Sequence, residues 1–239
     1  MKIEVFSGPD TAAREAARIV ASEAREAVAE RGRFVAAFSG GHTPLLMLRA
    51  LADEDVPWDR VHIVQVDERV APPGDPDRNF THLRENLLDH APVPPGHVHA
   101  MPMEEPDLGA AAAQYACTLQ SLAGSPPVLD LVHLGLGPDG HTASLVPGDP
   151  VLEVTNADVA VTGVYQGRRR MTMTYPILNR ARRILWLVTG GEKAGMLLRL
   201  NNGDPSIPAG RVSQDAALLL ADRAAAEQLG KNGRLEAKT

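Results

Sequence analysis

Four short apolar runs, each followed at once by a loop rich in glycine and polar residues, constrain the fold of this chain more than any other feature. The runs cover residues 34–38, 61–66, 129–134 and 184–188. Each has the length of a strand and is almost continuously apolar, as a strand that is buried on both faces must be. The alternating segment 2–6 adds a further candidate strand. The sequence therefore predicts a parallel sheet.

Helix-like stretches separate these runs along the chain. They comprise residues 11–30, 44–51, 81–88, 108–122, 192–200 and 214–229. The alternation predicts an α/β fold with a doubly wound, mostly parallel sheet, helices on both faces and ligands at the carboxyl edge of the strands. The stretches rich in Pro and Gly are short, so residues 1–239 are expected to form a single domain.

The segment 151–174 does not follow this alternation clearly. Residues 158–164 and 171–175 are possible strands on either side of the basic run 168–170. Arg170 stands where the second of these strands would start. The topology of this part of the chain is left open.

Composition argues against several classes of function. The formal net charge is −6, whereas nucleic-acid-binding proteins usually carry a clustered excess of Lys and Arg. The N-terminus lacks the apolar core of a signal peptide, and no run of about 18 apolar residues occurs. The one cysteine, Cys117, cannot form an internal disulfide. We expect a cytoplasmic protein that acts as a monomer or weak homo-oligomer, without nucleic-acid or membrane partners.

The loops that follow the four apolar runs hold the residues suited to chemistry. Since parallel strands end at one edge of a sheet, these loops are expected to meet there. Their sequences are Ser39-Gly40-Gly41-His42-Thr43, Asp67-Glu68-Arg69, Gly135-Leu136-Gly137-Pro138-Asp139-Gly140-His141-Thr142 and Thr189-Gly190-Gly191-Glu192-Lys193.

The first of these loops has the features of an anion site. Gly40 and Gly41 let backbone N–H groups approach a ligand, Thr43 is the expected N-cap, and Pro44 suits the first turn of a helix. The spacing is not that of a nucleotide-binding P-loop, so a single phosphate is the expected ligand. The alternative is a tight turn between strand and helix that binds nothing.

Two cations stand near this loop in the predicted fold. Lys193 opens a helix, where its charge opposes the helix dipole and calls for an anion beside it. Arg69 could serve the same anion. Either side chain could instead be an ordinary solvated or ion-paired cation.

The third loop ends in Asp139-Gly140-His141, which places an imidazole at the sheet edge as a candidate general base. The carboxylate of Asp139 is positioned to orient the ring. His62, His82, His90 and His133 are interpreted as structural. His97 and His99 have a spacing that could bind metal, but no cysteine or other ligand cluster is near them in the sequence, so no metal site is predicted.

Two other enzyme classes fit the sequence less well. Gly135, Gly137 and Gly140 match the dinucleotide fingerprint, but Pro138 lies within the turn and 147–148 is Pro-Gly, which interrupts any long helix. No Gly-x-Ser-x-Gly motif is present, so a serine nucleophile lacks its usual signal, and Ser144 is interpreted as part of a turn.

In combination, six motifs resemble the 6-phosphogluconolactonases over nearly the whole chain. In order they are Ser-Gly-Gly-His-Thr-Pro, Val-Asp-Glu-Arg-Val, Leu-Gly-Leu-Gly-Pro-Asp-Gly-His-Thr-Ala-Ser-Leu-Val-Pro-Gly, Arg-Met-Thr-Met-Thr, Val-Thr-Gly-Gly-Glu-Lys and Ile-Pro-Ala-Gly-Arg-Val. The resemblance implies an α/β enzyme of the oxidative pentose phosphate pathway. It implies hydrolysis of a phosphorylated six-carbon sugar lactone by water, with no metal or organic cofactor.

The same resemblance suggests a role for each site residue. His141 would be the base. In the mechanism that we expect on this basis, Arg170 or backbone N–H groups stabilise the oxyanion, and Asp67 is the next candidate base. The phosphate would be surrounded by Ser39, Gly40, Gly41, Thr43, Arg69 and Lys193, and the sugar by Asp67, Asn79 and Arg170.

The chain departs from the family pattern at His42 and Arg78, where the family commonly has Ser. The nearest rival is a glucosamine-6-phosphate deaminase-like isomerase, whose second motif usually ends in Asp-Glu-Tyr and whose third carries an acid after the His. A non-catalytic sugar-phosphate sensor is the other class, and it would keep the anion loop without needing His141.

Overall fold

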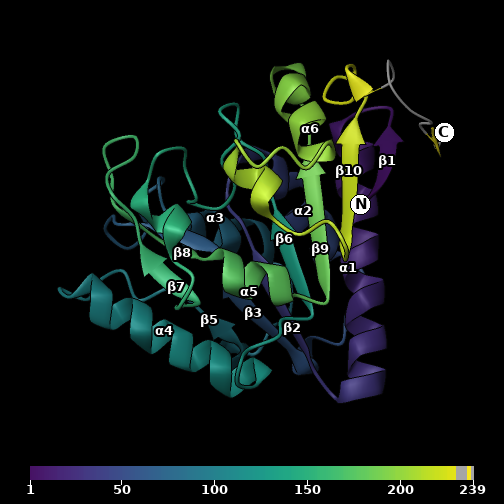
Figure 1. Ribbon diagram of the computed structural model, residues 1–239. Helices are drawn as coiled ribbons and strands as arrows, with labels where there is room; N and C mark the ends of the chain where they lie inside the picture. The colour runs from purple at the N-terminus through teal and green to yellow at the C-terminus, as the bar shows by residue number, and fades with distance from the viewer. Residues whose placement is uncertain (230–235, 238–239) are drawn as a thin grey trace.

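The centre of the protein is a parallel sheet, as the sequence predicts (Figure 1). The computed structural model describes residues 1–229 and 236–237, and of His42, Glu236 and Ala237 the backbone only. Neighbouring strands follow the order β11-β1-β10-β9-β6-β2-β3-β5, and each pair is parallel. The strands are β1 (Lys2–Phe6), β2 (Phe34–Phe38), β3 (Val61–Gln65), β5 (Val98–His99), β6 (Leu131–Leu134), β9 (Arg183–Val188), β10 (Ala217–Asp222) and β11 (Glu236–Ala237).

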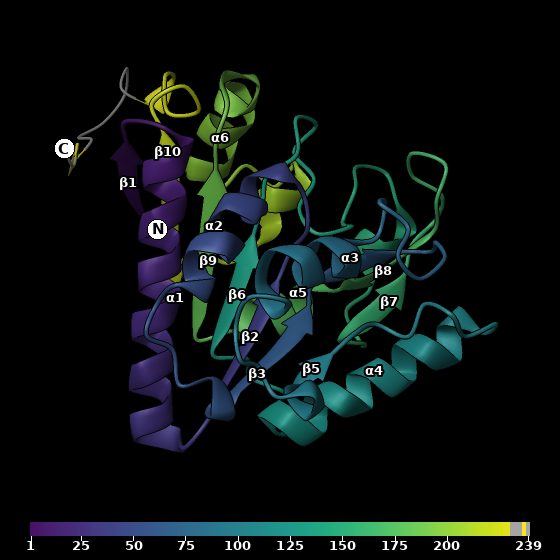
Figure 2. The same ribbon diagram turned by 180° about the vertical axis from the view of Figure 1, so that it is seen from behind.

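Helices cover both faces of this sheet, which makes the fold doubly wound (Figures 1 and 2). The α-helices are α1 (Pro9–Arg31), α2 (His42–Ala52), α3 (Asn79–Leu83), α4 (Leu108–Ala123), α5 (Tyr175–Arg180) and α6 (Ala194–Asn201). Alternate residues of β2 show the two layers. Phe34 joins the apolar cluster of α1 and α2, whereas Val35 joins the cluster that contains Tyr115 of α4. The two-sided burial explains why the strands are almost continuously apolar.

A second, smaller sheet stands beside the large one and settles the topology of the segment that the sequence left open. It is antiparallel, with the order β4-β8-β7. β7 (Val159–Val161) lies within the first expected strand region, and β8 (Arg170–Met173) overlaps the second but begins one residue earlier, so that Arg170 starts the strand. The third strand, β4 (Asp67–Arg69), was expected to be a loop. Its register places Arg69 opposite Arg170 and Asp67 opposite Thr172.

The helix predicted over residues 214–229 is wrong. The structure has β10 over Ala217–Asp222 and then turns as far as Leu229. Alanine and leucine favour a helix, but only by a few tenths of a kcal/mol per residue. Here Leu219 and Leu220 face opposite layers of the core, in a strand held between β1 and β9. Burial on two faces outweighs the local preference.

One further expectation needs adjustment. The helix expected over 81–88 begins at Asn79 and changes to a wider π-helical turn over Arg84–Leu88. In the part of the chain that is described, no helix combines the length and the apolar character needed to cross a membrane.

Candidate active site

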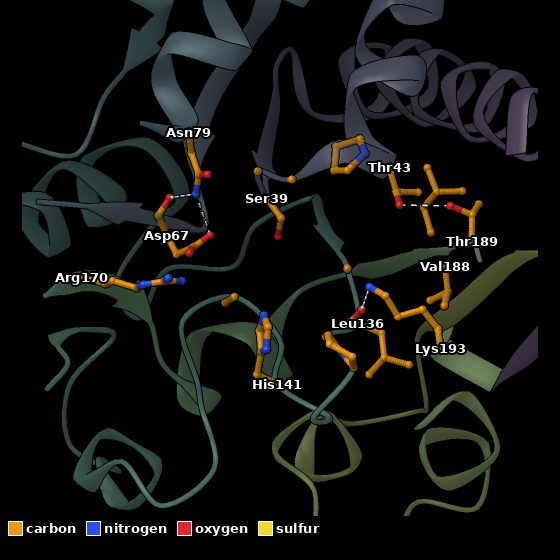
Figure 3. A pocket seen from close by; sticks show the side chains of 18 of the residues that line it. Ser39, Thr43, Asp67, Asn79, Leu136, His141, Arg170, Val188, Thr189 and Lys193 are labelled. Carbon is orange, nitrogen blue, oxygen red and sulfur yellow. Dashed lines mark hydrogen bonds between the residues drawn. The ribbon is translucent and has the colours of Figure 1, made fainter. Parts of the chain in front are cut away.

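The four loops predicted to share one sheet edge do meet there. Their residues line one cavity at the carboxyl ends of β2, β3, β6 and β9 (Figure 3). Of the eleven residues given a catalytic or binding role from the sequence, ten line this cavity: Ser39, Gly40, Gly41, Thr43, Asp67, Arg69, Asn79, His141, Arg170 and Lys193. Asp139 is not part of the lining, but its side chain contacts His141, which is.

His141 and Asp139 form a tightly hydrogen-bonded pair. Nδ1 of His141 lies 2.6 Å from Oδ1 of Asp139, and the same oxygen accepts from the backbone N–H of His141 at 3.1 Å. An ionised carboxylate can only accept, so Nδ1 is the donor, and in the neutral ring Nε2 therefore keeps its lone pair. The ring of His141 projects into the cavity (Figure 3). This is the tautomer and orientation that a general base requires.

The electrostatics of Asp139 favour its ionised form. Burial by itself would raise the pKa of this carboxyl group. The hydrogen bonds from the backbone and ring of His141, together with one from the hydroxyl of Tyr165, outweigh that effect and lower the pKa. A charged Asp139 can stabilise the imidazolium that forms when His141 takes up a proton.

The loop that carries His141 is closed by its own backbone and leads into no helix. The N–H of Gly137 donates to the carbonyl of His141 at 2.8 Å, and Gly140 has a positive φ of 84°. A dinucleotide fold needs a helix N-terminus here for the pyrophosphate. Between β6 and β7 the described chain has only turns and a short 3₁₀ segment at Pro150–Glu153. The geometry therefore does not support nicotinamide binding at these glycines.

The glycine-rich loop leads into α2, but its cap differs from the prediction. The helix begins at His42 with Gly41, at φ 112°, in the N-cap position. The expected N-cap role of Thr43 is therefore wrong, because its backbone already lies inside the helix. Its hydroxyl is 3.0 Å from that of Thr189 and joins the first loop to the fourth. A positive φ at the cap explains why a glycine stands there.

Gly40 is required for a different reason. A Cβ atom at this position would lie 1.9 Å from Oδ1 of Asn79, so only glycine fits against that side chain. Next to it, the hydroxyl of Ser39 donates to the carbonyl of His133 in β6 at 2.9 Å. Ser39 therefore ties the loop to the neighbouring strand.

Lys193 places its ammonium group at the rim of the same cavity (Figure 3). Nζ donates to the carbonyl of Leu136 at 2.5 Å, and an ammonium has three N–H donors. Burial lowers the pKa of Lys193, although Glu192 and Asp139 act in the opposite direction. A half-buried cation in contact with a carbonyl dipole is well placed to bind an anionic ligand.

The other side of the cavity holds two arginines and an amide. Arg69 and Arg170 stand opposite each other in the β4–β8 pair. Burial, followed by repulsion from Arg69, lowers the pKa of Arg170. Within the described structure, Nε of both arginines and Oδ1 of Asn79 are buried without a hydrogen-bond partner. Such atoms are costly to bury unpaired, so they indicate a polar ligand.

The side chain of Asp67 is held in place by hydrogen bonds from two neighbouring side chains. Its Oδ2 accepts from the hydroxyl of Ser144 at 2.6 Å, and its Oδ1 accepts from Nδ2 of Asn79 at 3.2 Å. The side chain is buried, with 3% of the residue exposed. Both oxygens are thus engaged with protein donors, which makes Asp67 a weaker candidate base than His141.

Glu68 and Arg78 are two buried residues whose contribution the sequence did not reveal. Glu68 accepts hydrogen bonds from the backbone N–H groups of Asn79 and Phe80, and so caps α3. Nε of Arg78 lies 3.3 Å from Oε2 of Glu68. Together they fix the start of the helix that presents Asn79 to the cavity. Arg78, one of the two departures from the family pattern, is thus a supporting residue behind the site.

The two histidines considered for metal binding lie away from this cavity. His62 stands between them, with Nδ1 3.2 Å from Nε2 of His99 and its ring centroid 4.2 Å from that of His97. Burial, followed by repulsion from His97 and His99, lowers the pKa of His62 to about 4. No group of three or more His, Cys, Asp or Glu side chains in the described residues is arranged to hold a metal ion.

Comparison with known proteins places these features in a family. Residues 7–220 match the family described as glucosamine-6-phosphate isomerases/6-phosphogluconolactonase. The chain belongs to this family. A 6-phosphogluconolactonase from a Nostoc species is 36% identical over 211 residues, which cover 85% of this chain and 88% of that relative.

Solved structures show how widely the fold of this family is shared. The 6-phosphogluconolactonase of Thermotoga maritima matches with a TM-score of 0.82 at 27% identity, covering 92% of this chain and 98% of that one. A monomeric glucosamine-6-phosphate deaminase matches with a TM-score of 0.83 at 22% identity, covering 95% and 100%. The fold alone therefore does not separate the two activities of the glucosamine-6-phosphate isomerase/6-phosphogluconolactonase family.

Proposed function

We propose that this chain is a 6-phosphogluconolactonase, which hydrolyses 6-phospho-D-glucono-1,5-lactone to 6-phosphogluconate in the oxidative pentose phosphate pathway. The observation that carries the proposal is the Asp139–His141 pair, whose imidazole faces a cavity that also contains Lys193 and Arg170 (Figure 3). The names of the lactonase relatives and the motifs of this chain support the same reaction. We place the enzyme in the cytoplasm, as a monomer or weak homo-oligomer.

In the proposed reaction, Nε2 of His141 removes a proton from a water molecule as the water oxygen bonds to C1 of the lactone. The carbonyl electrons move to the carbonyl oxygen and form a tetrahedral oxyanion. Asp139 stabilises the imidazolium, as its ionised carboxylate lies against Nδ1. When the carbonyl reforms, the bond from C1 to the ring oxygen breaks, and His141 returns its proton to that oxygen. The residues of this chain supply both proton transfers without a metal or an organic cofactor.

The oxyanion is proposed to interact with Arg170. This guanidinium is buried and keeps Nε without a partner in the described structure, so a developing negative charge would satisfy it. It extends toward the cavity from β8, across from Lys193 (Figure 3). Asp67 and Asn79 would orient the sugar hydroxyls on the same side.

The phosphate is proposed to bind the loop from Ser39 to Thr43 together with Lys193. The N-terminal end of α2 supplies backbone N–H groups and a partial positive charge, and Lys193 supplies a full one. Arg69 belongs to the same proposal on the strength of the family resemblance. It stands opposite Arg170 in the β4–β8 pair and lines the same cavity as Lys193, so variants of both residues compare the two cations.

The test of this function is an assay of proton release from freshly generated 6-phosphogluconolactone, compared with the spontaneous reaction. We expect acceleration that is unaffected by exhaustive chelation and needs no nicotinamide. A parallel assay of ammonia release from glucosamine 6-phosphate should give no signal. Deaminase activity without lactone turnover would show the isomerase alternative, and tight phosphosugar binding without turnover would show a sensor.

A further inference from the structure

The turn that joins β7 to β8 carries a tyrosine that contacts three groups of the candidate active site. Tyr165 and Arg168 face each other across the turn, with N–H to carbonyl distances of 2.9 and 3.2 Å. Gln166 and Gly167 between them both have positive φ, 52° and 79°. Two central residues that both have positive φ are typical of a tight hairpin turn. The turn therefore holds Tyr165 in a defined position.

The hydroxyl of Tyr165 donates to Oδ2 of Asp139 at 3.0 Å. The ring lies edge-on to His141, at 5.7 Å between centroids and 65° between planes. The guanidinium carbon of Arg170 lies 4.9 Å above the centre of the same ring. The orienting acid, the base and the proposed oxyanion cation are thus all in contact with one side chain.

The contact with Asp139 completes the hydrogen bonding of a carboxylate that is not enclosed by the core. The Asp139 side chain is 36% exposed, and Oδ1 serves only His141. Oδ2 accepts from Tyr165, so each oxygen of the carboxylate is engaged by a different residue while Oδ1 stays against Nδ1 of His141. Gln166 adds a second tie, because its Oε1 accepts from Arg170 at 3.1 Å.

We propose that Tyr165 is a positioning residue of the hydrolytic site, which holds Asp139 through its hydroxyl and Arg170 through the face of its ring. This inference rests on the proposed function, in which Asp139 orients His141. Tyr165 remains protonated near neutral pH, because burial and then Asp139 raise the pKa of its hydroxyl, with Arg170 acting in the opposite direction. It is therefore a constant donor to the carboxylate.

The sign of the effect on His141 follows from charge. A donor on Oδ2 withdraws negative charge from the carboxylate, which then holds the imidazolium less strongly. Removing the hydroxyl in Tyr165→Phe returns that charge toward Nδ1. His141 should then keep its proton to a higher pH, by up to about one pH unit for one hydrogen bond. The aromatic face under Arg170 is unchanged in this variant.

Tyr175→Phe is a matched control. The hydroxyl of Tyr175 also donates to an oxygen, the carbonyl of Pro208 at 2.9 Å, and Arg211 lies 4.7 Å above its ring. It contacts neither Asp139 nor His141 in the described structure. A loss that reflects only a missing tyrosine hydroxyl would therefore appear in both variants.

The experiment measures the titration of the His141 ring by NMR and the pH profile of kcat/KM for both variants. For Tyr165→Phe we expect an upward shift in both measurements and a kcat about 2–10-fold lower, with KM unchanged. For Tyr175→Phe we expect neither. A third variant, Tyr165→Leu, should also raise KM or lower kcat further, because Arg170 loses its support.

An unchanged His141 titration in a folded Tyr165→Phe protein would overturn the inference, and so would an equal shift in Tyr175→Phe. The NMR titration does not depend on turnover. If the wild-type protein proves inactive on the lactone but the shift appears, the proposed function fails while the link from Tyr165 to His141 stands.

Discussion

Gly137 lies directly against the ring of His141. A Cβ atom at Gly137 would be 2.1 Å from Nδ1 of His141 and 2.3 Å from Cε1, far closer than any real contact. The backbone N–H of Gly137 also donates to the carbonyl of His141 at 2.8 Å. The ring therefore reaches its position against Asp139 only because residue 137 has no side chain.

Gly137→Ala is expected to displace the imidazole while leaving the fold in place. Gly137 does not have a positive φ, so alanine fits its backbone, and the clash is with a side chain that can turn away. Losing the alignment of the base should lower kcat at least about tenfold. Gly96→Ala is the control, since a Cβ there meets no atom within 4 Å. Equal kcat in the two variants would contradict this account of Gly137.

His141→Asn should keep folding and substrate binding but lower kcat by about 10²–10⁴-fold, the usual contribution of a positioned acid–base group. Asn can form a hydrogen bond but cannot take up the proton. In the wild type, kcat/KM should fall on the acid side as the imidazole is protonated, and this limb should vanish in the variant. Rates must be corrected for spontaneous hydrolysis. A folded variant that keeps kcat within about threefold would leave no general-base role for His141, and Asp67 would be examined next.

Lys193→Ala should weaken binding of the phosphorylated lactone by about 1.5–3 kcal/mol if its ammonium bonds the phosphate. Unphosphorylated gluconolactone should be affected little, so the preference between the two substrates should shrink. Arg69→Ala tests the second proposed cation by the same measurement of KM on both lactones. Arg60→Ala is the control, because Arg60 is exposed and pairs only with Asp59 among the described residues. Unchanged preference in both site variants would refute the phosphate assignment.

The parallel sheet could be predicted because burial on two faces leaves a plain sequence signal. Strands such as β2 and β9 are apolar without interruption and end at loops of unusual composition. β10 carries the same signal, but its Ala and Leu residues equally suit a helix. Only its pairing with β1 and β9 makes this segment a strand. The three residues of β4 could not be recognised as a strand, because pairing with β8 about a hundred residues later defines them.

The candidate site could likewise be predicted only in part. The loops that meet at the sheet edge are predictable from topology, and Asp139 is close to His141 in sequence. Contacts between distant segments are not predictable from a single chain. Ser144 reaches Asp67 across 77 positions, and Tyr165 reaches Asp139 across 26. Neither pair has a spacing that marks it in the sequence, because each depends on how the small antiparallel sheet is placed against the large one.

The buried imidazole of His133 should make the protein less stable in acid. His133 lies in β6, fully buried, and in the described structure neither ring nitrogen has a hydrogen-bond partner. Burial lowers its pKa to about 3, from the ordinary imidazole value of 6.5. Between these two values the unfolded chain binds a proton that the folded chain does not, so the free energy of unfolding rises with pH. The contribution of the neutral His133 ring to the free energy of unfolding is complete above pH 6.5 and is lost as the pH falls toward 3.

The size of this effect can be measured with His133→Leu, which keeps the backbone carbonyl that Ser39 uses and removes the titrating ring. One pKa unit corresponds to 1.36 kcal/mol, so the wild type should lose about 2 kcal/mol more than the variant between pH 6 and pH 4. Urea unfolding of the wild type and of His133→Leu at pH 6 and at pH 4 gives the change in the free energy of unfolding for each protein. At neutral pH the variant should be equally stable or more stable, because an unpaired polar ring is replaced by an apolar side chain. The exposed His90, changed to Leu, controls for the loss of one imidazole. If His133→Leu shows the same pH dependence as the wild type, the ring of His133 must already be solvated or paired in the folded protein.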